Sequence, residues 1–383
     1  MNLKGISYYL GLFCFPVSFL AFVNILYSSY FDYFLNINSY IITLILSLLF
    51  GLGLLYLGKN CNRKIIFIDQ LLLIILVYFL ISNFIALPFY LSNYQVTFIN
   101  SLFESISGIT GTGFSIFQNI KYLDPTLILW RSSSQWIGGL YFLFFLILIF
   151  SNKQFNFKMN ELTYSGDGSI NSATNVKNLI FKIFILYSLL SLIIFILLNL
   201  SEVRLFNSLN LTMTLISTGG FIPTNSLNKI ISTNLQKIIF IFSLLLSMLN
   251  LFLIFNIFKT KILFREHKED FYLIFVSLIL ILLVFLNNFS GLDIIISVLS
   301  SISNSGLSII EADNNLGLYF LLITLIGGSL ISNSSGIKLT RLVILLKTTS
   351  IEIIKLISPN SIINKNIFNS EKKITDDYIK ISF

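Results

Sequence analysis

The sequence predicts an all-α integral membrane protein, in which two leading transmembrane helices precede three repeats of helix, re-entrant segment and helix. Composition is the first reason. Of the 383 residues, 55% are hydrophobic and 11% are charged, whereas soluble globular proteins carry roughly 25% charged residues. The second reason is a glycine motif that occurs three times, each time after a short amphipathic segment and between two hydrophobic spans. The chain is therefore predicted to be polytopic and internally repeated.

Eight segments are long and apolar enough to cross a bilayer, which takes about 20 residues for ~30 Å of hydrocarbon. They are residues 6–28, 39–57, 65–88, 125–150, 178–200, 238–258, 271–287 and 316–347. The first of them lacks the small-residue cleavage signature of a signal peptide, so we interpret it as a retained span. Each is expected to be a transmembrane helix.

Three further amphipathic segments are too short to cross and are predicted to be re-entrant half-helices. They are residues 96–110, 203–217 and 292–303. Their positions divide the chain into five parts. These are two N-terminal transmembrane helices (1–64), a first, second and third pore repeat (65–150, 151–258 and 259–347) and a cytoplasmic tail (348–383).

Each half-helix leads into a loop of hydroxyl or amide residues, a glycine and an apolar residue. The loops are residues 110–114, 216–221 and 303–307. Irregular backbone at membrane depth is tolerated where protein or a water-filled cavity surrounds it, and carbonyls freed there can replace the hydration shell of a cation. The sequence thus predicts an ion selectivity filter at Gly113, Gly220 and Gly306, with carbonyls also from Thr112, Thr218, Gly219 and Ser305. The alternatives are close-packing glycines between helices and ordinary helix capping by the hydroxyl residues.

The charges predict one topology. Basic residues gather in the loops after the second, fourth and sixth spans, whereas the opposite face has only Lys121 and Lys229. The basic residues in these loops are Lys59, Arg63, Lys64, Lys153, Lys158, Lys177, Lys259, Lys261, Arg265 and Lys268. Positive-inside reasoning then places the N-terminus and the tail in the cytoplasm and the three glycine motifs on the outer side. In a membrane protein the net charge of +8 is typical of such loops, not of nucleic-acid binding.

Other functional classes find little support. Cys14 and Cys61 lie in or beside apolar spans and His267 is the only histidine, which argues against a disulfide framework and a zinc site. The predicted spans hold no carboxylate pair or nucleophile constellation, so an intramembrane enzyme is not expected. No cofactor motif occurs, and the expected ligand is the transported ion, held by filter backbone carbonyls alone.

Taken together, these motifs resemble the Trk/Ktr/HKT superfamily of potassium, and sometimes sodium, uptake proteins, and in particular its bacterial TrkH branch. The resemblance covers about residues 77–360. Its strongest carriers are Phe103-Glu104-Ser105-Ile106-Ser107-Gly108 leading into Thr112-Gly113, Trp130-Arg131-Ser132, Gln135-Trp136-Ile137-Gly138-Gly139, Ser217-Thr218-Gly219-Gly220-Phe221, Ile326-Gly327-Gly328 and Ser332-Asn333-Ser334-Ser335-Gly336-Ile337-Lys338 with Arg341.

The resemblance implies several further features. It implies potassium uptake driven by membrane potential in the plasma membrane, the inner membrane of a bacterium, by a homodimer with a cytoplasmic nucleotide-binding, TrkA-like regulatory subunit. It also implies that residues 327–338 form an intramembrane gating loop that breaks the second helix of the third repeat. The gating residues implied are Gly327, Gly328, Ser335, Gly336, Lys338 and Arg341. Serines and an asparagine replace much of the glycine and alanine usual in that loop.

Family members arrange four repeats around a pseudo-fourfold axis, and the sequence to Phe383 holds three. A pore with one quadrant absent would leave backbone groups facing lipid. The expectation is that a separate polypeptide or another protomer supplies the last quadrant, that the reading frame is interrupted, or that the product is a non-conducting remnant or accessory subunit.

Two charged pairs have competing interpretations. Glu104, in the first half-helix, either raises the local cation concentration or supports the filter backbone, and Arg131 either pairs with it or extends to the headgroups. Lys338 and Arg341 are predicted to share one helical face, where Lys338 forms an electrostatic barrier under the filter or an inner-leaflet anchor. Asn250 is expected to form an interhelical hydrogen bond.

Overall fold

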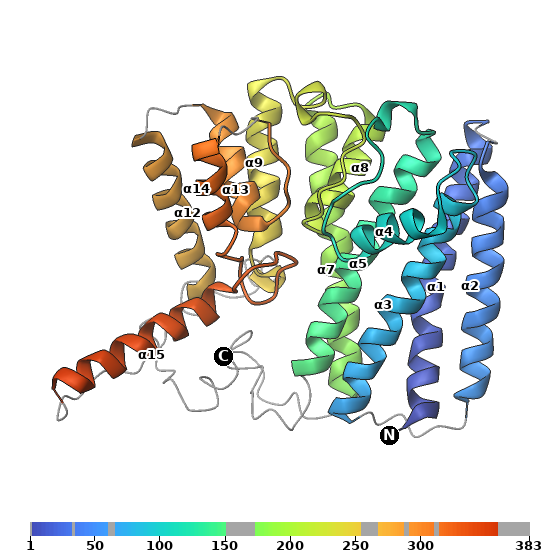
Figure 1. Cartoon of the computed structure of the whole chain (residues 1–383), viewed down its shortest axis with the longest axis horizontal. Helices are drawn as coiled ribbons and strands as arrows, with labels where there is room; N and C mark the ends of the chain where they lie inside the picture. The colour runs from blue at the N-terminus through green and yellow to red at the C-terminus, as the bar shows by residue number, and fades with distance from the viewer. Residues whose placement is uncertain are drawn as a thin grey trace. The chain divides into compact units, whose positions relative to one another are not determined.

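The computed structural model describes residues 2–32, 35–59, 66–150, 173–253, 267–286, 291–309 and 314–358. Within these ranges the chain is helical, apart from loops and one isolated β-bridge between Ile326 and Ile337 (Figure 1). It forms two compact units, Met1–Asn152 with Ser188–Ile239, and Lys153–Tyr187 with Phe240–Phe383. The all-helical fold class predicted from the sequence is confirmed.

Unit 1 holds the two leading helices and most of the first two repeats. Its elements are α1 (Leu3–Tyr30), α2 (Ile37–Leu57), α3 (Phe67–Tyr90), α4 (Phe98–Ile109), η1 (Ile120–Tyr122), α5 (Pro125–Phe150), the second part of α7 (Ala173–Leu200), α8 (Leu205–Ile216), η2 (Leu227–Lys229) and the first part of α9 (Asn234–Met248). The α1–α2 pair is close because both helices place glycines at their contact: a Cβ on Gly11 would lie 2.8 Å from the Gly51 carbonyl oxygen. Small residues allow such backbone approach in membrane helices.

Unit 2 holds the third repeat. It contains α12 (Lys268–Leu286), the half-helix α13 (Leu292–Ser303), α14 (Asn314–Ile323) and α15 (Leu339–Ile357), with the first part of α7 and the end of α9. α13 packs against both α12 and α14. Residues 324–338 between α14 and α15 are not helical, so the span predicted over 316–347 is interrupted where the family resemblance implied a loop at 327–338.

The predicted spans are confirmed to different extents. Among the described residues, five helices are long and apolar enough to cross a membrane, namely α1, α2, α3, α5 and α7. The continuous helix predicted over residues 238–258 is wrong, because α9 ends at Met248 and residues 249–250 are not helical. α15 runs on to Ile357, ten residues into the predicted tail. Most of the basic loop residues used for the topology prediction lie outside the described residues.

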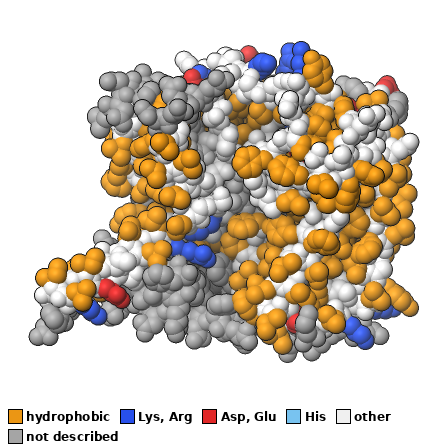
Figure 2. All heavy atoms as spheres, in the orientation of Figure 1, with side chains coloured by type: hydrophobic (Ala, Val, Ile, Leu, Met, Phe, Trp, Pro, Cys, Tyr) orange, Lys and Arg blue, Asp and Glu red, His pale blue; other side chains and the backbone are white. Residues whose placement is uncertain are grey.

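The surface of the described residues is largely apolar, as a protein in a bilayer requires. Figure 2 shows hydrophobic side chains over much of the described surface in view. Among the described residues, Phe19, Phe79 and Phe181 each have about two thirds of their surface exposed. The core of unit 1 also contains buried serine hydroxyls, which donate hydrogen bonds to carbonyls of their own helix. Ser82 donates to the Phe79 carbonyl and Ser133 to the Trp130 carbonyl. This arrangement satisfies polar groups without water.

The first half-helix is seated on α5 through a glycine contact, which yields a prediction. A Cβ on Gly138 would lie 2.0 Å from the Ile109 carbonyl oxygen at the end of α4. We expect Gly138→Ala to lower the free energy of unfolding by about 1–3 kcal/mol, the usual cost of overpacking. The measurement is the thermal unfolding midpoint in detergent.

The matched control is Gly53→Ala. Gly53 lies in α2, and a Cβ there would meet no described atom within 4 Å. An equal loss of stability in both variants would contradict the close α4–α5 contact.

Candidate functional site

The three half-helices have the same length and the same C-terminal geometry. α4, α8 and α13 have 12 residues each, or ~18 Å at about 1.5 Å per residue, too short to cross. Beyond each one a residue takes left-handed φ: Gly111 (70°), Thr218 (52°) and Asn304 (57°). The next amide then bonds the carbonyl five residues back: Thr112 to Ser107, Gly219 to Thr214 and Ser305 to Ser300.

This termination is of the Schellman type, in which a left-handed residue turns the chain away from the helix axis. The three glycine motifs are therefore repeats of backbone geometry as well as of sequence. Each half-helix brings the partial negative charge of its C-terminus to the start of its loop. The backbone amides of Thr112, Gly219 and Ser305 close these turns, a role that any residue with an N–H could fill. A contribution of their carbonyls to ion binding stays a prediction.

The first two motifs meet at their glycines. A Cβ on Gly113 would lie 2.6 Å from the Gly220 Cα and 2.8 Å from its nitrogen. Gly113 also has a φ of +81°, which L side chains rarely adopt. Two of the three predicted filter glycines thus lie together in unit 1. The third, Gly306, lies in unit 2 with a φ of +66°, and no described atom lies within 4 Å of its Cβ position.

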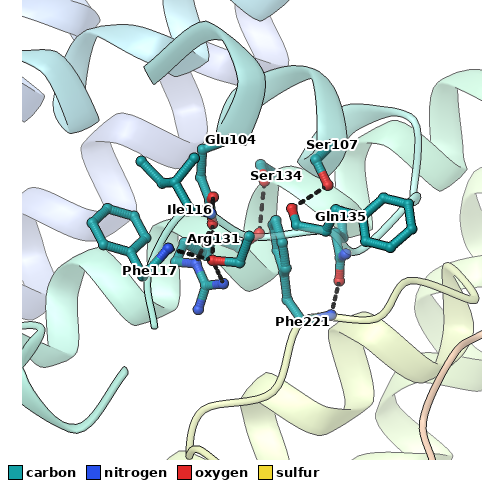
Figure 3. A network of polar contacts seen from close by, with 10 residues as sticks. Glu104, Ser107, Ile116, Phe117, Arg131, Ser134, Gln135 and Phe221 are labelled. Carbon is teal, nitrogen blue, oxygen red and sulfur yellow. Dashed lines mark hydrogen bonds and ion pairs between the residues drawn. The ribbon is translucent and has the colours of Figure 1, made fainter. Parts of the chain in front are cut away.

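A buried ion pair between Glu104 and Arg131 lies next to the first glycine motif (Figure 3). The Arg131 Nε donates to Glu104 Oε1 at 2.8 Å, and the two side chains are 1% and 0% exposed. Glu104 also accepts from the Ile116 amide at 2.9 Å and the Ser115 hydroxyl at 3.1 Å, and Arg131 Nη2 bonds that same hydroxyl. Because Arg131 is buried, the headgroup interpretation of this residue is wrong. The pair fixes the segment that leaves the first glycine motif.

The Glu104–Arg131 pair also touches the second motif. The Arg131 guanidinium lies 4.2 Å from the Phe221 ring centroid and 5.7 Å from that of Phe117, within cation–π range. One ion pair therefore contacts both glycine loops of unit 1, the first (residues 110–114) through Ile116 just beyond it and the second (residues 216–221) through Phe221.

Gln135 is a second residue of α5 that contacts the second glycine motif. It was not among the predicted site residues, although it lies in the matching sequence. Its Oε1 accepts from the Phe221 amide at 3.3 Å, and its side chain occupies the place where a Cβ on Gly219 would be. Glycine at 219 thus leaves space for the side chain of Gln135 from α5. A single sequence does not show that two positions so far apart along the chain are in contact.

The broken helix of the third repeat forms a loop whose two ends are joined. The Gly327 amide donates to Ile337 O at 2.9 Å and the Ile337 amide to Leu325 O at 3.0 Å. A Cβ on Gly327 would lie 2.2 Å from Ser335 O, and one on Gly328 would lie 2.5 Å from Met248 O. The two glycines are therefore required by close packing against backbone. We call residues 324–338 the intrahelical loop.

The intrahelical loop is tied to the third glycine motif. Asn304 Nδ2 donates to Thr324 O at 3.1 Å, where the loop begins. A Cβ on Gly336, whose φ is +76°, would lie 3.1 Å from the same Asn304 nitrogen. A predicted filter segment and the predicted gating loop are thus in direct contact within unit 2.

Lys338 points back into the loop and does not share a face with Arg341. Lys338 precedes the first residue of α15 and is 9% exposed, whereas Arg341 is exposed. The Lys338 Nζ bonds Ser332 O at 2.9 Å and Oγ at 3.0 Å, and Ser334 O at 2.6 Å and Oγ at 3.3 Å. The predicted shared helical face is wrong because the helix begins only at Leu339.

Known proteins with similar sequences are transporters. The chain is 27% identical over 374 residues to an uncharacterized cation transporter of Methanocaldococcus jannaschii, covering 94% of this chain and 75% of that protein. It is 25% identical over 356 residues to the Trk system potassium uptake protein TrkG of Escherichia coli, covering 88% of this chain and 73% of the relative. A 60-residue segment is 45% identical to TrkI of Halomonas elongata, 16% of this chain and 12% of that protein. No protein-family model matches the chain.

The fold matches the crystal structure of the potassium transporter TrkH from Vibrio parahaemolyticus. The TM-score is 0.82 at 17% identity, over 100% of this chain and 82% of that one. The chain is thus similar in sequence to a cation transporter and to Trk potassium uptake proteins, and it shares the fold of TrkH. All of these relatives are named as transport proteins and none as an enzyme.

In the TrkH-like chain, two consecutive carboxylates at the start of α12 hold the intrahelical loop, and the sequence analysis missed both. Glu269 accepts from the Thr340 hydroxyl at 2.7 Å, from the Thr340 amide at 3.3 Å and from the Leu330 amide. Glu269 thus joins the loop to the first turn of α15.

The second carboxylate, Asp270, explains why α9 stops. Asp270 Oδ1 accepts from the Asn250 amide at 2.8 Å and its Oδ2 lies 3.0 Å from His267 Nδ1. The next amide, Leu251, donates to Ile331 O of the loop. Asn250 does bond to another helix, α12, but through its backbone amide. Its side-chain Oδ1 accepts a hydrogen bond from the Phe252 amide.

The Glu104–Arg131 pair gives a prediction for the TrkH-like chain. Removing one partner leaves a buried charge uncompensated, at a cost of about 3–5 kcal/mol. We expect Glu104→Leu and Arg131→Met each to lower the unfolding midpoint strongly, and the double variant to lose less than the sum of the two. The measurement is a double-mutant cycle of thermal unfolding in detergent. Additive losses would mean that the two groups do not interact.

Proposed function

We propose that this TrkH-like chain carries monovalent cations, potassium foremost, inward through a filter lined by glycine backbone. The observation that carries the proposal is the shared ending of the three half-helices, each with a left-handed residue and a bond five residues back. Such ends present carbonyls and partial negative charge, which suit a cation that must shed water. The contact between Gly113 and Gly220 supports a narrow passage without side chains.

The relatives support potassium as the cation, because TrkG, TrkI and TrkH are each named for potassium uptake or transport. The filter residues proposed are Thr112, Gly113, Thr218, Gly219, Gly220, Ser305 and Gly306. Glycine in all three repeats resembles the potassium-selective members rather than those with serine in the first repeat. Inward movement of one charge gains about 2.3 kcal/mol per 100 mV of membrane potential, which is the proposed driving force.

The intrahelical loop is the proposed gate. Lys338 places a positive charge within it, and that charge would oppose cation passage until the loop moves. Gly327, Gly328, Ser335 and Gly336 allow its compact fold. Arg341, being exposed, is better suited to an anchor at the inner leaflet.

The proposed setting is the plasma membrane, the inner membrane in a bacterium, with a cytoplasmic N-terminus. By its resemblance to the family, the chain acts as a homodimer and binds a TrkA-like nucleotide-binding subunit on its cytoplasmic side. Any response to nucleotides would come from that subunit. Glu104 and Arg131 support the filter without contacting the ion.

The direct test is growth of a bacterium deficient in potassium uptake at micromolar to millimolar potassium. The chain is expressed as printed and, separately, with any coding sequence that continues downstream. Growth rescue by either form supports the proposal. Absence of rescue by both, with the protein shown to be in the membrane, contradicts it.

Gly220→Ser tests the filter. A β-carbon and hydroxyl at the contact with Gly113 would disturb the carbonyl positions, so we expect the ratio of potassium to sodium uptake to fall several-fold. Gly53→Ser is the matched control, because the same substitution there meets open space. The measurement is competitive rubidium and sodium uptake into cells. An unchanged ratio in a conducting Gly220→Ser protein would remove Gly220 from the filter.

Gly328→Ala tests the gate separately. The new methyl group would collide with Ser334 Oγ and Met248 O and displace the intrahelical loop. We expect faster uptake with an unchanged potassium to sodium ratio, because the filter is not touched. Gly317→Ala in α14, where no described atom lies within 4 Å of the Cβ position, is the control. Slower uptake, or a changed ion ratio, would argue against a gating role for the loop.

A further inference from the structure

The Lys338 ammonium occupies a site that has the chemistry of a monovalent-cation site. Four oxygen atoms, two carbonyls and two hydroxyls from Ser332 and Ser334, surround its Nζ at 2.6–3.3 Å. All of these oxygens are uncharged. Neutral oxygens in a compact ring are the ligands by which proteins hold alkali cations in place of water.

The hydroxyls of this oxygen site are oriented to accept from a cation. The Ser332 hydroxyl donates to Ser329 O at 2.7 Å, which leaves its lone pairs for the ammonium. Ser334 Oγ accepts from the Gly328 amide at 2.8 Å and lies 2.9 Å from Ser332 Oγ. The loop therefore fixes the oxygen positions by bonds of its own, independent of the lysine.

The ammonium fits this site imperfectly in one respect. An ammonium on a carbon stem has three N–H donors, and four oxygens lie within bonding distance. A spherical ion has no such directional limit and can be shared by all four. Potassium and free ammonium are nearly equal in size, so either could replace the lysine nitrogen without expansion of the ring.

We propose that Ser332 and Ser334 of the intrahelical loop form a binding site for a potassium-sized monovalent cation, and that Lys338 fills it as a tethered cation. The closed loop is then stabilised by its own positive charge. Withdrawal of the lysine exposes a site that a permeating ion can occupy, so the loop opens by exchange of one cation for another. The proposal concerns binding in the loop and stands apart from the filter.

The test opens the site by removing the lysine side chain and reads cation binding, not transport. Lys338→Ala leaves the oxygen ring open, whereas Lys338→Met removes the charge but fills the same space. The full chain is purified in detergent, and its unfolding midpoint is measured in potassium, ammonium, sodium and choline chloride at equal ionic strength. Any cation that binds only the folded state raises the midpoint in a saturable manner.

We expect Lys338→Ala to gain a saturable midpoint increase in potassium and ammonium that the wild-type chain and Lys338→Met lack. Adding Ser332→Ala to Lys338→Ala should abolish the gain, because one of the four oxygens is lost. Lys355→Ala, an exposed lysine on α15, controls for loss of a charge and should behave as wild type. Cation binding at the proposed filter is common to all variants and cancels in the comparison.

The same cation dependence in Lys338→Ala and in Lys338→Met would overturn the proposal. If Lys338→Ala is unstable in choline, the yields of monodisperse protein purified in potassium, ammonium and choline are compared. Recovery only in potassium and ammonium supports the site, and equal loss in all three overturns it. Neither outcome alters the uptake proposal, whose tests are growth and ion ratio.

Discussion

The structure depends on one constraint, which is that every backbone amide and carbonyl at membrane depth must find a partner inside the protein. The long helices meet it by their own bonds, but the half-helix ends and the intrahelical loop cannot. At these places the chain uses a small set of devices: left-handed turns that return an amide to the helix end, hydroxyls that bond local carbonyls, and buried carboxylates that accept backbone amides. Glu104 accepts the Ile116 amide, Glu269 the Leu330 and Thr340 amides, and Asp270 the Asn250 amide.

These carboxylates also explain how irregular backbone stays rigid enough to position a filter. A buried charge is costly unless it is paired and hydrogen-bonded, and Glu104 has both an arginine and two further donors. The Arg131 side chain extends the same brace to the Phe221 ring of the second motif. A single ion pair thus contacts both the first and the second glycine loop, so its removal is expected to disturb the conformation of both. The geometry of the proposed filter loops is therefore set by groups that do not contact the ion in our proposal.

The sequence predicted the fold class and the half-helices because these follow from hydrophobic length and from glycine position, whereas the broken span was implied by the family resemblance alone. The half-helix predicted at 292–303 matches α13 residue for residue. The details that failed are those set by tertiary contact. Hydrophobicity continues beyond Met248, so no local signal shows that Asp270 and Ile331 take the amides of Asn250 and Leu251 and end the helix. Likewise, three-residue spacing puts Lys338 and Arg341 on one face only if a helix is already present at 338, whereas α15 begins at Leu339.

The third repeat departs from the other two in a way that links filter and loop. Gly111 and Thr218 take the left-handed position in the first two motifs, but the third has an asparagine there. Asparagine tolerates this conformation and adds a side-chain donor, which Asn304 uses to bond Thr324 O where the intrahelical loop starts. Movement of that loop must break or stretch this bond, so the conformation of the turn that ends α13 depends on the conformation of the loop. In the proposed mechanism, a cation at the third motif and Lys338 in the intrahelical loop act on one connected piece of backbone, so we expect ion occupancy and loop position to depend on each other.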